Sequence, residues 1–431
     1  MTQDEQGNVV PDAADAGRRR GARQSGLSRK DRSGGSGKRR AATPGRTVAK
    51  TIGAALLTLA LATGVAVSMV YNHWNSLIDT QDVSGQLHNR PDKKVTGPQE
   101  PLNILVMGSD TRQGAGNNID GMTAIGQRSD TTILIHLSAD RKFAYGISIP
   151  RDTLVDRPTC YKEDGTEIPP ASDVMWNDAF SVGGPACTIQ QFEQVSGVRV
   201  DNYVVVDFNG FKDMVDALDG VEVCIPEEID DPEHNITLEP GTREIKGDEA
   251  LSYVRVRYTV GDGTDPNRIR RQQAFMASMI NKAVSAGMLA RPDRIVSFMN
   301  ALTGALQTDF KSIGEIAGVA KTFRGIGLDQ IKFVTTPWVY STTQEGRVEW
   351  TPEVKKLWRL VINDEELTPE FAEQSISAAD NPEGGSDTTS SDTATDPSST
   401  ATDGTTGGKK GGGDTQQGLS SDAREAAGLC T

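Results

Sequence analysis

The sequence is poor in the residues that usually carry metal-dependent or nucleophilic chemistry. Its four histidines and four cysteines form neither an HExxH nor a CxxC pair. Ser148 lies in GISIP rather than in the GxSxG elbow of serine hydrolases. The glycine-rich stretch at 114–121 lacks the full GxGxxG spacing. These absences argue against a histidine- or cysteine-based metal site, a serine hydrolase and a dinucleotide-binding enzyme.

The sequence also lacks an even distribution of charge. Its formal net charge is −14, but residues 1–50 are basic and residues 377–431 are acidic, so the total says little about the folded part. An acidic balance argues against nucleic acid as the main partner. Residues 1–50 and 371–431 are rich in small and polar residues and offer little apolar surface to bury. We therefore predict two disordered tails, one basic and one rich in Ser, Thr, Gly and Asp.

A single long apolar segment, TIGAALLTLALATGVAVSMV at 51–70, contains no charged residue. Its length suits a helix that crosses a bilayer, so we predict a transmembrane helix at 51–71. The basic residues before it predict a cytoplasmic N-terminus, which places the rest of the chain outside the cell membrane. A cleaved signal peptide is the alternative, but no clear small-x-small cleavage site precedes Tyr71. Residues 72–101 are predicted to be a stalk or a short helix.

The four cysteines are expected to form disulfides, because the domain after the membrane helix is predicted to be exported. Four cysteines permit three pairings, and the sequence alone does not choose among them. We favour Cys160 with Cys187, since both flank one loop region, which leaves Cys224 for Cys430 at the end of the tail. Free thiols are the alternative.

Apolar runs from residue 102 onward predict an α/β domain at 102–286, with an α/β continuation at 287–370. LNILVMG at 102–108 reads as a buried strand that ends in glycine. Two further strands, at 131–137 and 143–149, are separated by a short polar turn and are predicted to form a hairpin. Other strands are expected at 203–208, 221–225 and 331–335, and helices at 211–218, 270–286, 294–306 and 313–323.

Arginine and aspartate recur in short clusters at the ends of these elements. The clusters are GSDTR at 108–112, RSD at 128–130, PRD at 150–152, RVR at 255–257 and RIRRQQ at 268–273. A single charge cluster is usually a solvated face, but several at element boundaries indicate a ligand site, because α/β sheets gather ligands at strand ends. Arginine binds phosphate through two parallel hydrogen bonds, and aspartate supplies oxygen ligands for Mg²⁺. The clusters therefore predict a polyanion held with a divalent metal.

The spacing within the last two clusters predicts which side chains act together. Arg255 and Arg257 are two apart in a run read as extended, so their side chains should point to one face. Arg268 shares a helix face with Arg271 and Gln272, near a helix start where free N–H groups favour an anion.

The motifs GSDTR, QRSDT, ISIPRDT, DGVEV, GDEALSYVRVR and DPNRIRRQQ, in this order, resemble those of the LytR-CpsA-Psr family of bacterial cell-wall proteins. The disulfide-compatible cysteines and the polar tail are most similar to high-GC Gram-positive (actinobacterial) members. The resemblance implies a central mixed β-sheet flanked by helices in an α-β-α arrangement. It also implies transfer of a glycopolymer from a polyprenyl-diphosphate carrier to the C6 hydroxyl of N-acetylmuramic acid in peptidoglycan. Teichoic acid, capsule and arabinogalactan are not distinguished.

The resemblance implies roles for individual residues. Catalytic roles fall on Asp110, Asp130, Arg151, Arg255 and Arg268. The implied diphosphate-binding set is Arg112, Arg128, Arg151, Arg255, Arg257, Arg268, Arg271 and Gln272. Mg²⁺ (or Mn²⁺) would be held by Asp110 and Asp130, Asp110 is a candidate base, and Asp152 would orient Arg151.

One residue departs from the family pattern. Met175 stands just before the Asn-Asp-Ala-Phe motif, where a lysine is often found, so one phosphate contact is in doubt. Two other functions are open: a regulator that binds polyprenyl phosphate, and a pyrophosphatase that uses water as the acceptor.

Overall fold

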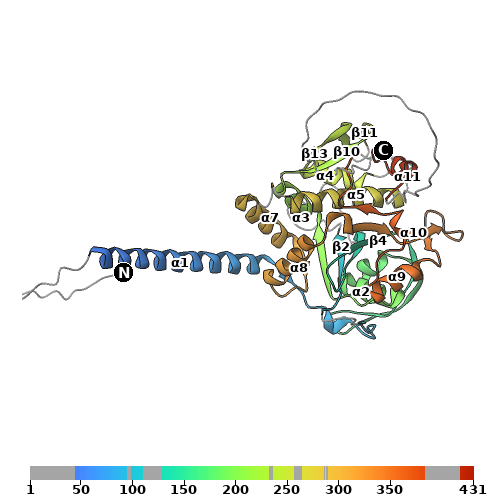
Figure 1. The fold of residues 1–431 in the computed structure, drawn as a ribbon. Helices are drawn as coiled ribbons and strands as arrows, with labels where there is room; N and C mark the ends of the chain where they lie inside the picture. The colour runs from blue at the N-terminus through green and yellow to red at the C-terminus, as the bar shows by residue number, and fades with distance from the viewer. Residues whose placement is uncertain are drawn as a thin grey trace, which may run out of the picture. The chain divides into compact units, whose positions relative to one another are not determined.

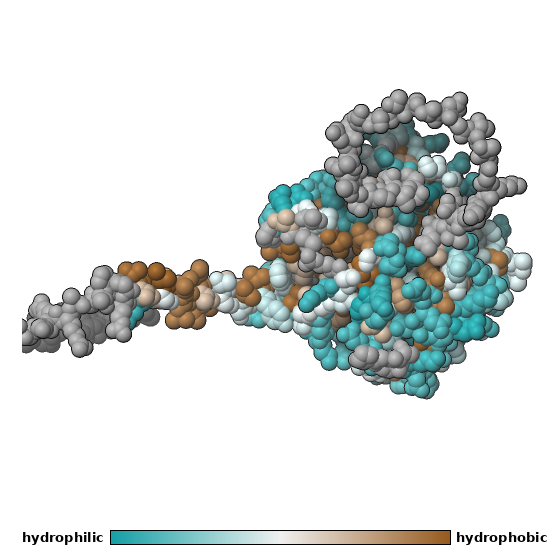
Figure 2. All heavy atoms as spheres, in the orientation of Figure 1, coloured by the Kyte–Doolittle hydropathy of each residue, from teal (hydrophilic) through white to brown (hydrophobic). Residues whose placement is uncertain are grey.

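The computed structural model describes residues 44–94, 99–109, 129–232, 236–256, 265–285, 287, 290–383 and 418–431. The chain divides into two units, residues 1–64 and 65–431. One long helix, α1 (Pro44–Leu77), contains an apolar stretch, Val48–Leu77, that is long enough to cross a membrane. Its apolar side chains are exposed (Figure 2), as expected for a helix that meets lipid. The helix continues six residues beyond the predicted end at 71.

The second unit is built on an eight-stranded mixed sheet with the order β1-β14-β9-β2-β3-β4-β15-β18. Its strands are β1 (Asp79–Thr80), β2 (Leu102–Ser109), β3 (Ser129–Leu137), β4 (Ala144–Ile149), β9 (Asn202–Asp207), β14 (Leu306–Thr308), β15 (Ile331–Thr335) and β18 (Ile376–Ser377). β3 and β4 form the predicted hairpin, while β2 pairs in parallel with β9 and β4 with β15. The mixed sheet confirms the predicted fold class, and strands after residue 286 complete it.

Helices cover both faces of this sheet (Figure 1). Side chains alternate along a strand, so Leu105 and Met107 of β2 face one layer and Ile104 and Val106 face the other. The first layer contains α2 (Asp178–Ser196) and α9 (Val354–Asn363). The second layer contains α5 (Asp265–Val284), α7 (Pro292–Ala305) and α8 (Ile313–Gly325). The result is the α-β-α arrangement.

Smaller elements extend this framework. The short helices are η1 (Ser84–Gln86), α3 (Phe208–Ala217), α4 (Gly247–Arg255), η2 (Leu328–Gln330), α10 (Pro369–Ala372) and α11 (Ser421–Ala426). Two-stranded sheets pair β5 (Leu154–Arg157) with β8 (Ala171–Met175), β6 (Cys160–Tyr161) with β7 (Glu167–Ile168), β10 (Val221–Ile225) with β13 (Gly241–Ile245), β11 (Ile229–Asp231) with β12 (Ile236–Leu238), and β16 (Trp338–Tyr340) with β17 (Val348–Trp350). Both favoured disulfides are present, Cys160–Cys187 and Cys224–Cys430.

Two predicted boundaries are wrong. Residues 72–101 are not a free stalk, because β1 joins the sheet edge and Val83 is buried in the core. Residues 371–431 are not a tail throughout, because Phe371 and Ile376 are buried and so are Ala427 and Leu429 near the C-terminus. Both segments are polar on average, but each contains a few apolar residues that pack against a core built by the rest of the chain. Residues 1–43 and 384–417 lie outside the described residues.

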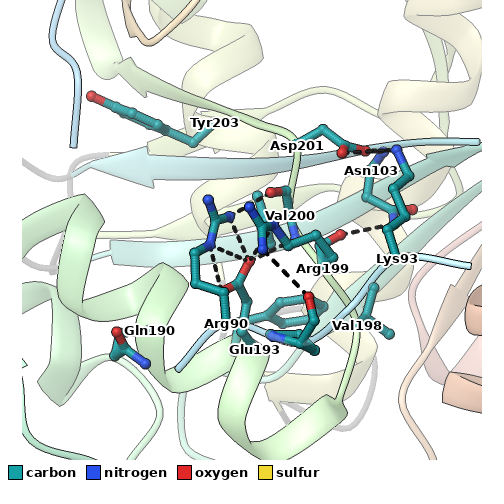
Figure 3. Close-up of polar contacts among 12 residues, drawn as sticks. Arg90, Lys93, Asn103, Gln190, Glu193, Val198, Arg199, Val200, Asp201 and Tyr203 are labelled. Carbon is teal, nitrogen blue, oxygen red and sulfur yellow. Dashed lines mark hydrogen bonds and ion pairs between the residues drawn. The ribbon is translucent and has the colours of Figure 1, made fainter. Parts of the chain in front are cut away.

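The segment after β1 is anchored to the domain by buried ion pairs (Figure 3). Glu193 of α2 has no exposed side-chain surface and accepts hydrogen bonds from Arg90, the shortest from Nη2 at 2.6 Å, and from the backbone N–H of Val200 at 2.9 Å. Lys93 donates to both carboxylate oxygens of Asp201 at 2.8 Å. These contacts hold residues 88–94 against the α2 layer.

The start of α3 is fixed by a side-chain cap, and its contact with α7 depends on a glycine. Asp207 caps α3 by accepting from the backbone N–H of Gly210 at 2.7 Å. A Cβ added at Gly210 would lie 2.3 Å from the Cβ of Ala305, so glycine is needed where α3 crosses α7. At the start of β9, the end of the strand away from α3, burial raises the pKa of Asp309, although hydrogen bonds from Asn202 and the Tyr203 backbone act in the opposite direction.

Candidate functional site

The predicted site residues converge where four strands of the central sheet end or begin. Ser109, the last residue of β2, is opposite Ser129 of β3 and Asp207 of β9, and the antiparallel β3–β4 pair brings Arg151 back to this edge. Arg151 Nη1 lies 2.5 Å from Asp130 Oδ1. Asp130 of the RSD cluster and Arg151 of the PRD cluster therefore lie at strand ends, as predicted.

A cavity of ≈ 390 Å³ opens at this edge between the sheet and α3, α4 and α5. Most of its wall is apolar, and includes Phe208, Phe211, Met214, Phe275, Met276 and Met279. Its described polar lining consists of Asp130, Thr131, Arg151, Asp207, Asp231, Arg255, Arg268 and Gln272. We call Arg151, Arg255 and Arg268 the arginine cluster. Such a cavity suits a ligand with a long apolar part and an anionic head.

Asp265, the first residue of α5, connects two members of the arginine cluster. Its Oδ1 lies 2.5 Å from Arg268 Nη2 and 3.5 Å from Arg151 Nε. Burial lowers the pKa of Arg151, but the carboxylates of Asp130 and Asp265 outweigh this effect and the net shift is upward. Asp265 begins the DPNRIRRQQ motif but is not among the site residues predicted from the sequence. Its position three residues before Arg268 on a helix was the available signal.

Arg255 reaches the cavity from a helix, which corrects one prediction. The run at 253–255 was read as extended, but α4 continues to Arg255. The Arg255 guanidinium carbon lies 4.8 Å from the centroid of the Phe208 ring, a cation–π contact that orients it. Gln272 of α5 accepts from Thr131 Oγ1 at 3.4 Å and donates to the Val254 carbonyl at 3.0 Å.

Arg271 does not line the cavity, so its predicted place in the diphosphate-binding set is wrong. Its side chain is 1% exposed. It donates to the backbone carbonyls of Val256 and Ala427. Residues three apart on a helix differ by about 60° in direction, which is enough to send Arg268 into the cavity and Arg271 into the protein.

Asp152 lies behind the arginine cluster. Its Oδ2 is 3.7 Å from Arg151 Nε, and its Oδ1 accepts from Arg347 Nη1 at 2.8 Å. Asp152 thus lies between Arg151 and Arg347, an arginine that is not among the site residues predicted from the sequence, and its orienting role stays a prediction. Met175 pairs with Leu154 in the β5–β8 sheet and does not line the cavity.

Several predicted site residues, Asp110, Arg112, Arg128 and Arg257, lie outside the described residues. Within the described ranges no group of three His, Cys, Asp or Glu side chains is arranged to hold a metal. Mg²⁺, however, commonly takes only one or two carboxylates together with substrate phosphates and water. Asp130, whose side chain is 29% exposed and faces the cavity, fits that kind of site.

The fold and cavity define a protein in which an apolar cavity with an arginine cluster opens where strands of a mixed sheet end. A family model described as the LytR_cpsA_psr family matches residues 69–361, and the chain belongs to this family.

Relatives with known names are similar over part of their length. The chain is 33% identical over 230 residues to the "Probable cell wall biosynthesis protein LcpB" of Corynebacterium glutamicum, covering 52% of each chain. It is 30% identical over 248 residues to the "Polyisoprenyl-teichoic acid--peptidoglycan teichoic acid transferase TagV" of Bacillus subtilis, covering 56% of this chain and 59% of TagV. A crystal structure of B. subtilis TagV matches 62% of this chain and 99% of that one at 26% identity, with a TM-score of 0.48. The chain thus spans between half and two thirds of the length of these two named relatives.

Proposed function

We propose that this protein is a membrane-anchored phosphotransferase that moves a glycopolymer from a polyprenyl-diphosphate carrier to peptidoglycan. The observation that carries the proposal is the cavity, in which an apolar wall leads to the arginine cluster. The wall suits a polyprenyl chain and the arginines suit its diphosphate. The named relatives in cell-wall biosynthesis and teichoic acid transfer support the same reaction class.

In this reaction a hydroxyl of the acceptor sugar attacks the phosphorus that carries the glycan. A new O–P bond forms, the bond to the bridging oxygen breaks, and polyprenyl phosphate leaves. Arg151, Arg255 and Arg268 would stabilise the charge that develops on the phosphoryl and bridging oxygens. The acceptor proton passes to a carboxylate at this edge, for which Asp110 remains the candidate.

We also propose a divalent cation, Mg²⁺ or Mn²⁺, at Asp130 and Asp110. Three arginines and three aspartates line the described part of the cavity, so their formal charges balance before any ligand binds. A diphosphate adds negative charge, and a bound cation would neutralise it. Asp130 would share its carboxylate between the cation and Arg151.

The membrane helix fits this function, because it would keep the domain beside the bilayer that holds the lipid carrier. We propose that the N-terminus is cytoplasmic and that residues after α1 lie outside, where peptidoglycan is found. Protease added to intact spheroplasts should then cleave an epitope-tagged C-terminus but not an N-terminal tag.

The full chain in lipid vesicles, supplied with a lipid-linked glycan, peptidoglycan and Mg²⁺, tests the proposal. We expect a covalent glycan–peptidoglycan product, which Arg255→Ala should reduce by at least about a hundredfold. Arg291→Ala is the matched control, because Arg291 is an exposed arginine paired only locally with Asp293. Release of polyprenyl phosphate without a glycan–peptidoglycan product would indicate a pyrophosphatase instead. Donor binding without turnover would indicate a regulator.

A further inference from the structure

The C-terminal end of α4, which carries Arg255 into the cavity, is held by two side chains of α5. Gln272 Nε2 donates to the Val254 carbonyl at 3.0 Å, and the Arg271 guanidinium donates to the Val256 carbonyl. Carbonyls at the end of a helix lack partners within the helix and need others. A cation there also interacts favourably with the helix dipole. The direction of Arg255 therefore depends on the side chains that bind its two neighbours.

Arg271 is in turn held by the C-terminal segment, residues 418–431. Its Nη1 donates to the Ala427 carbonyl at 3.0 Å. Ala427 is fully buried, and Leu429 is nearly so, in a cluster that includes Ala277 of α5. Arg424 closes the segment on itself by donating to the Cys430 carbonyl at 2.6 Å. One guanidinium thus joins the end of α4 to the end of the chain.

A disulfide closes this arrangement. Cys430 is bonded to Cys224 of β10, a strand that shares a cluster with α4 and with Phe275 of α5. The bond joins residues 206 positions apart. It ties the C-terminal segment to elements that surround the cavity, whereas Cys160–Cys187 joins β6 to α2 in a separate cluster.

We propose that Arg271 is a positioning residue for the arginine cluster, and that the C-terminal segment, locked by Cys224–Cys430, holds it in place. A buried guanidinium is stable only while its acceptors remain, because leaving a buried charged donor without a partner is costly. If the segment detaches, Arg271 loses the Ala427 carbonyl and turns toward solvent. The Val256 carbonyl is then released, and Arg255 loses its fixed direction.

The Cys224–Cys430 disulfide can be opened by thiol exchange. A dithiol gives two electrons and two protons to the Cys224–Cys430 bond, which yields two thiols and the cyclic disulfide of the reductant. The positioning role of Arg271 rests on the proposed function only for the identity of the ligand, a polyprenyl diphosphate.

The ligand test compares a polyprenyl diphosphate with the neutral polyprenol of the same length, using the full chain in detergent. Cys224→Ala/Cys430→Ala and Arg271→Lys should each weaken diphosphate binding by about tenfold and leave polyprenol binding unchanged, because only the head meets the arginines. Lysine keeps the charge of Arg271 but lacks the planar fork that reaches two carbonyls. Cys160→Ala/Cys187→Ala is the matched control and should change neither affinity.

The pattern of losses distinguishes positioning from direct contact. If Arg271 touched the diphosphate itself, Arg271→Lys would weaken binding and the Cys224→Ala/Cys430→Ala variant would not, which would overturn the proposal. Equal loss of diphosphate and polyprenol binding would mean general unfolding and would also overturn it. Combined with the cysteine variant, Arg271→Lys should add little, since both act through one contact.

A ligand-free measurement separates this inference from the proposed function. Relative to the wild type, the Cys224→Ala/Cys430→Ala variant should show faster amide hydrogen exchange in α4, residues 247–255, but not in α9. Unchanged exchange in α4 would overturn the inference whatever the ligand is. A wild-type protein that binds no diphosphate would instead overturn the proposed function, while the exchange result still decides whether the C-terminal segment controls α4.

Discussion

Replacing Arg268 with alanine should weaken both ligand binding and folding. The two effects can be measured separately, because the effect on folding arises from the ion pair with Asp265. The side chains of Arg268 and Asp265 are 6% and 5% exposed, and their closest atoms are 2.5 Å apart. The variant therefore removes a cation from the cavity and also leaves a buried carboxylate.

The two effects have different sizes. Loss of charged hydrogen bonds to a diphosphate costs about 1.5–3 kcal/mol of binding free energy, or about 10- to 150-fold in Kd. Breaking a buried ion pair costs about 3–5 kcal/mol of unfolding free energy. We expect the lower end of that range, about 3 kcal/mol, because Arg151 remains 3.5 Å from Asp265 as a second cation.

The assay pairs chemical denaturation with titration of a polyprenyl diphosphate. Arg268→Ala should lower both stability and affinity, and Asp265→Asn with Arg268→Ala should recover most of the stability without the affinity. Asp265→Asn alone keeps the arginine and should bind nearly as well as the wild type. If the double variant regained full affinity, Arg268 would be only structural and the assignment of the arginine cluster would be refuted.

Three further predictions concern the framework. Glu193→Ala should lower the free energy of unfolding by about 3 kcal/mol, measured by denaturation, because Arg90 and the buried Val200 N–H lose their carboxylate acceptor; a loss below about 1 kcal/mol would contradict this. Gly210→Ala should cost about 1–3 kcal/mol through the clash with Ala305, whereas Gly304→Ala, with nothing within 4 Å, should be neutral or stabilising, and equal effects would refute the packing argument. The raised pKa of Asp309 means that its ionised form opposes folding, so wild-type stability from this group falls as pH rises from about 3.8 through the raised folded-state pKa. Asp309→Asn should therefore raise Tm at pH 7, with a gain that shrinks in acid; a gain independent of pH would contradict the pKa direction.

Local patterns were sufficient for much of the fold. The apolar run at 102–108 and the short polar turn between the runs at 131–137 and 143–149 predicted β2 and the β3–β4 hairpin, because both signals are local in the sequence. The apolar segment predicted α1 for the same kind of reason. Residues 371–383 and 418–431 were misjudged, since the apolar partners of Ile376 and Leu429 lie far away in the sequence.

For the candidate site, too, the sequence predicted some features and only the tertiary structure decided others. The sequence by itself determined the long apolar helix, the class of fold, and the chemistry of arginines and aspartates at strand ends, because these follow from residue type and short-range period. Only the tertiary structure decided that Arg268 enters the cavity while Arg271 turns to the C-terminal segment. It also decided that Asp265 links Arg268 to Arg151. These outcomes depend on which distant backbone carbonyls and carboxylates a side chain meets once the helices are packed, whereas local spacing signals only the pair of Asp265 and Arg268.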